Sequence, residues 1–336
     1  MKVVITGVLG FVGVNLALAC LNKGYKVIGF DNRFKTLGSE ENMQLFSENG
    51  GEYHHIDIRN NNDVESFFKN IKEIDVIYNM AAQVAFKNSV ENPRLDFEIN
   101  ALGTLNILES LRLYHSNAIF VNASTNQVYG NASSAEVTEH ESRFDFKDLE
   151  FGISEDFPLD FLSPYGCSKG SADLYTIDYA RVFDLKTVVT RFGGIYGIHQ
   201  YSYQDHGWVS FMAEMVAANK EFNRFGHGKQ VRDILYVSDI VNALLLCADK
   251  IDKVIGQAIN IAGGPKNSIS VLELLSKLEK ITGNKELSII NPMRKADKLV
   301  AYLDIRKAEK LLGWTPKVNV EQGLELLINW HKNKLT

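Results

Sequence analysis

The stretch Lys2-Val3-Val4-Ile5-Thr6-Gly7-Val8-Leu9-Gly10-Phe11-Val12-Gly13 decides the fold. Its first five residues are mostly β-branched, which is typical of a buried parallel strand. A turn with three glycines follows, and residues 14–21 continue with helical character. Glycines let the backbone N–H groups at a helix N-terminus approach a pyrophosphate, and the helix dipole favours that anion. The stretch therefore predicts a dinucleotide-binding turn, and its expected contact residues are Gly7, Gly10, Phe11, Val12 and Gly13.

An acidic residue ends the second expected strand. Residues 25–31 are largely apolar up to Asp31, which follows Gly13 by 18 residues. At that distance a carboxylate accepts hydrogen bonds from the adenosine ribose, and it repels a 2′-phosphate. Asp31, with Asn32 beside it, therefore favours NAD over NADP, although the cation of Arg33 weakens that preference.

Strand-like and helix-like segments then alternate. The expected strands are 53–58, 74–83, 118–125 and 185–191, and the expected helices are 63–71 and 95–114. This alternation predicts an α/β fold with a doubly wound parallel Rossmann sheet, in which the connections between strands are right-handed crossovers. We expect an NAD-binding Rossmann domain over residues 1–190. Residues 191–336 are expected to form a smaller α/β substrate-binding domain, with some segments returning to the sheet.

The composition argues against several other classes of protein. The chain has 336 residues, 45% of them hydrophobic and 23% charged, and its net charge is −5. These values are typical of a globular protein, and without a basic run nucleic acid is not an expected partner. Cys20, Cys167 and Cys247 are isolated, which suggests a reducing compartment and no metal site. The apolar runs are too short to span a bilayer, so we expect a cytoplasmic protein with no membrane partner.

Small residues and a hydroxyl follow two of the expected strands. Ala81, Ala82 and Gln83 come at the end of one strand, where small residues permit either close approach of a cofactor or tight packing. Thr125 ends another strand. Ligands of such sheets bind beyond the carboxyl ends of the strands, so we expect these positions to converge with the glycine turn.

A phenol and an ammonium are one helical turn apart in Ser163-Pro164-Tyr165-Gly166-Cys167-Ser168-Lys169. Residues 170–180 contain no proline and are expected to be helical, so Tyr165 and Lys169 share one face. A nearby ammonium favours the phenolate, which can take a proton from a sugar or alcohol hydroxyl. For this motif alone, a chance surface pair is the alternative.

Together these motifs resemble the extended short-chain dehydrogenases/reductases, which couple a G-x-x-G-x-x-G turn to a Tyr-x-x-x-Lys pair. The resemblance implies that Tyr165 is the catalytic acid/base and that Thr125 hydrogen-bonds the reacting sugar hydroxyl. It implies that Lys169 lowers the pKa of Tyr165 and binds the nicotinamide ribose, so that both residues also contact the cofactor. The further cofactor-binding positions that it implies are Asp57, Ile58 and Asn100.

Two amides after Thr125 distinguish between reaction classes. The chain resembles both nucleotide-sugar 4,6-dehydratases and nucleotide-sugar epimerases. In the dehydratases these two residues are Asp and Glu, which eliminate water. Here they are Asn126 and Gln127, and amides neither supply nor accept a proton at neutral pH. Oxidation followed by re-reduction remains, which is the chemistry of an NAD-dependent epimerase.

Two arginines resemble the diphosphate-binding residues of the nucleotide-sugar epimerases. Arg232 lies in Gln230-Val231-Arg232-Asp233, and Arg294 lies in Arg294-Lys295-Ala296-Asp297. Guanidinium groups suit phosphate oxygens, although either arginine alone could be a surface residue. The other substrate-binding positions that we expect are Thr125, Asn126, Gly194, Gln200 and Val209.

A narrower resemblance covers essentially the whole chain and is to the CDP-paratose 2-epimerases, also called CDP-tyvelose epimerases. It rests on residues 96–100, 124–126, 163–170, 207–209 and 228–233. It implies inversion at carbon 2 through a 2-keto sugar, with tightly bound NAD returning the hydride to the opposite face, in lipopolysaccharide O-antigen biosynthesis. Gln127 and residues 198–200 depart from the pattern and bear on which sugar or nucleotide is accepted.

Other functions remain open from the sequence. A 4-epimerase of the UDP-glucose/UDP-galactose type shares every motif except the narrower ones. An NAD-dependent sugar oxidoreductase would release NADH, and a non-catalytic NAD-sensing protein would have no use for an activated phenol. The expected partners are a nucleotide-diphosphate sugar and further copies of the chain, since members of this family often form dimers or tetramers. Helices over 95–114 and 170–183 could form such an interface.

Overall fold

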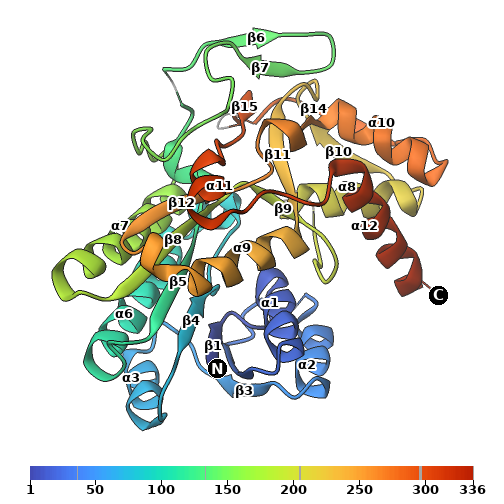
Figure 1. The fold of residues 1–336 in the computed structure, drawn as a ribbon. Coiled ribbons are helices and arrows are strands. Elements are labelled where there is room, and N and C mark those ends of the chain that lie inside the picture. The colour runs from blue at the N-terminus through green and yellow to red at the C-terminus, as the bar shows by residue number, and fades with distance from the viewer. Residues whose placement is uncertain (36, 133, 204–205, 295–296, 336) are drawn as a thin grey trace.

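A seven-stranded parallel sheet forms the centre of the protein (Figure 1). The computed structural model describes residues 1–35, 37–132, 134–203, 206–294 and 297–335. The strand order in the sheet is β12-β8-β5-β4-β1-β2-β3. Its strands are β1 (Lys2–Thr6), β2 (Lys26–Asp31), β3 (Glu52–His55), β4 (Val76–Asn79), β5 (Ile119–Thr125), β8 (Lys186–Phe192) and β12 (Gln257–Ile261).

Helices cover both faces of this sheet, which explains its continuous apolar strands. On one face lie α1 (Phe11–Asn22) and α9 (Val237–Asp249), which contact each other. On the other face lie α3 (Asn61–Asn70), α6 (Gly103–Tyr114) and α7 (Pro164–Phe183). In β1, every residue after Lys2 is buried, and Ile5 pairs with Gly29 on one side and Tyr78 on the other. The predicted doubly wound parallel sheet is confirmed.

Three of the expected elements differ from those in the structure. The strand expected over 53–58 is β3 and ends at His55, and the strand expected over 74–83 is β4 and ends at Asn79. The helix expected over 95–114 is divided into α5 (Pro93–Phe97), a π-helical segment η1 (Glu98–Leu102) and α6. As a result, the candidate residues after β3 and β4 lie in loops beyond the carboxyl ends of the strands.

The last part of the chain adds smaller sheets beside these carboxyl ends. Strand β10 (Phe222–Phe225) pairs with β14 (Ser288–Asn291). Strand β11 (Val231–Tyr236) pairs with β13 (Ser268–Ser270), β15 (Val300–Ala301) and β9 (Gly194–Tyr196). The helices of this part are α8 (Trp208–Ala217), α10 (Val271–Thr282) and α12 (Val320–Leu335). Two segments of this region return to the central sheet. Helix α9 packs on it, and strand β12 joins it by pairing with β8.

The remaining elements are short. They are α2 (Ser39–Glu48), α4 (Phe86–Glu91), η2 (Asn126–Tyr129), β6 (Val137–Glu139), β7 (Phe144–Phe146), η3 (Ile251–Lys253), η4 (Pro265–Asn267) and α11 (Arg306–Leu312). Across the described residues, no helix combines the length and the apolar character that crossing a membrane would require. The same ranges contain no group of three or more His, Cys, Asp or Glu side chains arranged to hold a metal ion.

Candidate active site

The glycine turn between β1 and α1 is packed so tightly that side chains would not fit. A Cβ on Gly7 would lie 2.7 Å from Cα of Ala81, and Gly7 also has a φ of +67°. A Cβ on Gly13 would lie 2.1 Å from the carbonyl oxygen of Gly7. The N-terminus of α1 at Gly10 has no capping side chain, so its N–H groups are open to an anion.

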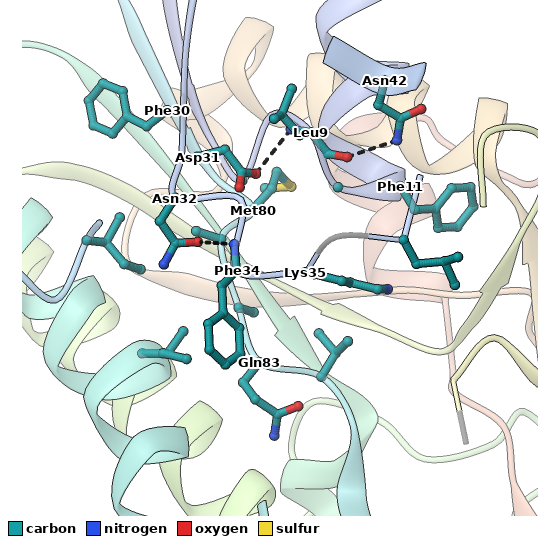
Figure 2. Close-up of a pocket in the computed structure, with 18 of the residues that line it drawn as sticks. Leu9, Phe11, Phe30, Asp31, Asn32, Phe34, Lys35, Asn42, Met80 and Gln83 are labelled. Carbon is teal, nitrogen blue, oxygen red and sulfur yellow. Dashed lines mark hydrogen bonds between the residues drawn. The ribbon is translucent and has the colours of Figure 1, made fainter. Parts of the chain in front are cut away.

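A first cavity opens over this turn and over the ends of β2, β3 and β4 (Figure 2). Predicted cofactor-binding residues gather there from four separate loops. Those that line the cavity are Gly7, Gly10, Phe11, Asp31, Asn32, Asp57, Ile58, Ala81, Ala82 and Gln83.

Asp31 is held in place at the end of β2. Its carboxylate accepts hydrogen bonds from the backbone N–H groups of Leu9 (3.2 Å) and Arg33 (2.7 Å). Burial raises its pKa, and these two hydrogen bonds oppose that shift. The side chain of Arg33 forms an ion pair with Glu40 and does not line the first cavity. The cation that weakened the preference for NAD over NADP is thus engaged elsewhere.

A buried polar network joins the β4 loop to the helix that carries Tyr165. The Asn100 amide accepts from the backbone N–H of Gln83 (2.9 Å) and donates to the carbonyl of Gln83 (3.0 Å). It also donates to Ser168 Oγ (3.0 Å), and Ser168 donates to Asp96 (2.5 Å). Asn100 and Val12 do not line the first cavity. Asn100 therefore holds the cavity wall at Gln83.

Tyr165 sits in the first turn of α7, where Ser163 caps the helix by accepting from the Gly166 N–H at 3.0 Å. The phenol is 9% exposed. A hydrogen bond with Thr125 lowers its pKa, but burial outweighs that effect and raises the pKa to about 12. We expected Lys169 to lower this pKa. The net shift is upward, with burial as its main cause, so that role of Lys169 stays a prediction.

Lys169 lies one turn further along α7 and is 3% exposed. Its ammonium donates to the carbonyl oxygen of Ala123 in β5 at 2.5 Å. Burial lowers its pKa to about 8, against the opposing effect of the Asp173 and Asp96 carboxylates. The structure thus brings Thr125, Tyr165 and Lys169 together at the ends of β5 and α7.

A second cavity meets the first at Val84, which lines both. Its wall includes Tyr165, Gln127, Arg232 and Arg294, all of which the sequence had singled out. Its other charged and aromatic lining residues are Phe86, His206, Trp208, Phe211, Arg224, Phe225, Asp297 and Lys298.

The two predicted phosphate-binding arginines differ in their surroundings. Arg232 donates to Asp297 at 2.5 Å, and Arg294 lies over the ring of Phe225 with 4.0 Å between its guanidinium carbon and the ring centre. Lys295 and Ala296, between Arg294 and Asp297, lie outside the described residues. The second cavity is therefore rich in cations and has one carboxylate among its described lining residues.

Some predicted substrate-binding residues do not line the second cavity. Gly194 lies opposite Ile234 in the β9–β11 pair, and Val209 is buried in α8. Gln200 is buried and hydrogen-bonded to Ser210. Asn126 is buried at the start of η2 and lies beside the Thr125 hydroxyl, at 3.5 Å. Val209 and, through Ser210, Gln200 belong to or contact α8, whose Trp208 and Phe211 line this cavity.

Several residues on the cavity walls carried no signal in the sequence. In the first cavity they include Phe34, Lys35, Asn42 and Tyr201, of which Asn42 donates to the Leu9 carbonyl at 2.8 Å (Figure 2). These residues come from segments with no motif of their own. The segments around Gly38 and Tyr201 pack closely against each other. A Cβ on Gly38 would lie 2.1 Å from the Tyr201 ring.

Comparison with known proteins defines the class first. The sequence profile of the GDP-mannose 4,6 dehydratase family matches residues 4–327. The chain belongs to this family, a branch of the extended short-chain dehydrogenases/reductases that the sequence motifs predicted.

Individual relatives narrow the comparison. The chain is 41% identical to the CDP-paratose 2-epimerase of Salmonella typhi, over 98% of this chain and 99% of that protein. It is 30% identical to the UDP-glucose 4-epimerase of Thermotoga maritima, whose structure with UDP-glucose superposes with a TM-score of 0.87 over 100% of both chains. The UDP-glucose 4-epimerase of Thermus thermophilus in complex with NAD is also 30% identical and has a TM-score of 0.83, over 99% of both chains.

Proposed function

We propose that the protein is an NAD-dependent nucleotide-sugar epimerase that converts CDP-paratose to CDP-tyvelose, within lipopolysaccharide O-antigen biosynthesis. One observation carries the proposal. Tyr165 lines a cavity that also contains Arg232 and Arg294, and this cavity shares the lining residue Val84 with the one over the glycine turn. The similarity to the CDP-paratose 2-epimerase of Salmonella typhi over almost the full length supports this choice of substrate.

The residues of the first cavity fit a bound NAD. The glycine turn leaves no room for side chains, and the open end of α1 suits a pyrophosphate. Asp31 would accept hydrogen bonds from the adenosine ribose, while Asp57 and Ile58 would border the adenine. Bound NAD would supply a hydride acceptor and donor. Relatives with NAD in their structures support the assignment of this cofactor.

The residues of the chain would then handle protons and phosphates. Tyr165 would remove the proton of the sugar C2 hydroxyl and return it later, with Thr125 holding that hydroxyl. Arg232 and Arg294 would grip the diphosphate while the 2-keto sugar turns over and presents its other face. Gln127 lines the cavity with an amide, which cannot eliminate water, so the proposed reaction stops at epimerisation.

Product analysis tests the proposed substrate. The enzyme is incubated separately with CDP-paratose and with UDP-glucose, and the sugars are identified by NMR. We expect CDP-tyvelose from the first and no reaction with the second. Steady accumulation of NADH with either substrate would instead indicate an oxidoreductase, and no turnover with any nucleotide sugar would indicate an NAD-sensing protein.

A 4-epimerase is the second candidate function. The similarity to the UDP-glucose 4-epimerase of Thermotoga maritima, with its TM-score of 0.87, favours it. Both reactions use the same Tyr165 and the same diphosphate grip, so they differ in the sugar orientation and in the base. Conversion of UDP-glucose to UDP-galactose in the assay above would establish this alternative.

We also propose a homo-oligomer, a dimer or a tetramer, in the cytoplasm, with residues 1–190 mainly binding NAD and residues 191–336 mainly binding the nucleotide sugar. Free cysteines at positions 20, 167 and 247 support a reducing compartment. Exposed apolar side chains along α5, η1, α6 and α7 support a helical interface between two copies. They are Phe97, Leu102, Leu113, Leu174, Tyr175, Val182 and Phe183.

A further inference from the structure

Arg224 is a buried cation of the second cavity to which the proposed reaction assigns no role. It lies in β10, is 8% exposed and lines the cavity. Among the residues that the structure describes, its Nε atom is buried and has no hydrogen-bond partner. Burying part of a guanidinium without an acceptor costs folding free energy, so a ligand atom is expected to fill that need.

Other residues of the second cavity can serve the phosphates. Arg232 and Arg294 are two further guanidinium groups in the described lining, and Lys298 lies there too, with a pKa that burial lowers to about 7. The two guanidinium groups of Arg232 and Arg294 suffice in number for the two phosphates of a nucleotide sugar. Arg224 is therefore free to take a neutral acceptor.

The neighbours of Arg224 suit a nucleobase. Asn223 and Phe225 on the same strand, together with Trp208 and Phe211 of α8, line the same cavity. Aromatic side chains give a base flat surfaces for stacking, and polar groups beside them can reach the edge of the base. Tyr165, which acts on the sugar, comes from a different part of the wall, at the start of α7.

We propose that Arg224 recognises the base and donates two hydrogen bonds, to O2 and N3 of cytosine. Both atoms are acceptors in cytosine, whereas N3 of uracil carries a hydrogen that would face the guanidinium N–H groups. Arg224 is then a residue that selects CDP-sugars over UDP-sugars. This inference rests on the proposed function, because that function supplies the nucleotide sugar in the second cavity.

Calorimetric titration of the NAD-loaded enzyme with CDP and with UDP tests this role. We expect the wild type to bind CDP about 10- to 100-fold more tightly than UDP. The reason is that in the UDP complex the charged guanidinium of Arg224 loses the N3 acceptor. Arg224→Met should weaken CDP binding by about the same factor and UDP binding by less than about threefold. Lys220→Met, which removes an exposed cation just before β10, is the matched control and should leave both affinities unchanged.

An analogue of CDP with CH in place of N3 tests the same contact on the wild-type protein, so that this measurement does not depend on the folding of a variant. The wild type should bind it about 10-fold more weakly than CDP, and Arg224→Met should bind both alike. Equal weakening of CDP and UDP by Arg224→Met would show a phosphate contact and overturn the proposal, as would unchanged affinities. Failure of the proposed function is distinguishable, because tight CDP binding without conversion of CDP-paratose would leave base recognition intact.

Discussion

Burial is the largest cause of the pKa shifts of Tyr165 and Lys169. The pKa of Tyr165 is raised to about 12, so the phenol is neutral at pH 7. The pKa of Lys169 is lowered to about 8, because its ammonium is enclosed between α7 and β5. A phenol with a raised pKa holds its proton at neutral pH, so it needs additional positive charge beside it to lower that pKa before it can act as a base.

Replacing the phenol tests its role as acid/base. We expect Tyr165→Phe to bind NAD as the wild type does, because Tyr165 lines the second cavity rather than the first. Its turnover should fall by about 10²- to 10⁴-fold, the usual contribution of a positioned acid/base. Turnover is measured with CDP-paratose, and bound NAD is quantified after denaturation. Turnover equal to that of the wild type would contradict the proposed chemistry.

The buried ammonium of Lys169 should appear in the pH dependence of stability. Its pKa is 10.5 in the unfolded chain and about 8 in the folded protein, so between these values the folded state binds fewer protons. Its contribution to stability is unfavourable below pH 8 and improves as the pH rises from about 8 to 10.5.

Lys169→Met removes that pH dependence. The free energy of unfolding of the wild type minus that of the variant should increase by on the order of 3 kcal/mol from pH 8 to 10.5. The measurement is denaturant unfolding at a series of pH values after bound nucleotide is removed. Parallel curves over this range would mean that Lys169 is not a buried cation.

Among the elements, the π-helical segment η1 joins the two halves of the site. It places Asn100 where one amide satisfies both backbone groups of Gln83 and reaches Ser168 on α7. Single π-helical turns inside α-helices often occur at functional sites. Here the turn connects the wall of the first cavity to the helix that carries Tyr165.

Asn100→Ala should disconnect these two elements. It leaves the part-buried N–H and carbonyl of Gln83 without these partners, at a cost of about 1–3 kcal/mol in the free energy of unfolding. We also expect weaker retention of NAD, measured as bound nucleotide after gel filtration. Asn62→Ala, at an exposed position of α3, serves as the control. Unchanged NAD retention in Asn100→Ala would show that the network only stabilises the fold.

At the scale of the whole molecule, an exposed apolar face on α7 is the main unexplained surface. Leu174, Tyr175 and Val182 share this face, and Val182 is 60% exposed. Next to it on α6 lies Leu113, while Arg112 covers the ring of Phe183 at 5.1 Å. Residues spaced in this way on two neighbouring helices suit a bundle with the same helices of a second copy.

Charges on this face should dissociate the proposed dimer. Leu174→Glu combined with Val182→Glu should give a monomer in light scattering after gel filtration, whereas the wild type gives a dimer. Ile290→Glu is the control, because Ile290 is 64% exposed on β14 and outside the four helical segments. A wild-type monomer, or a dimer that survives both charges, would exclude this interface.

The sequence by itself determined the central parallel sheet, the glycine turn and the pairing of the phenol with the ammonium. Buried parallel strands consist of β-branched runs, and the turn from β1 to α1 needs glycine where backbones touch, so both can be recognised without coordinates. The pairing of Tyr165 with Lys169 was equally accessible, because a four-residue spacing in a helix is a local property.

Only the tertiary structure decided which residues complete the two cavities. Lys35, Tyr201 and Arg224 lie in segments without motifs, and they reach the cavities through contacts between distant parts of the chain. The upward shift in the pKa of Tyr165 was also hidden, because burial depends on everything packed around the phenol. Local spacing determines which groups can act together, and long-range packing determines their surroundings.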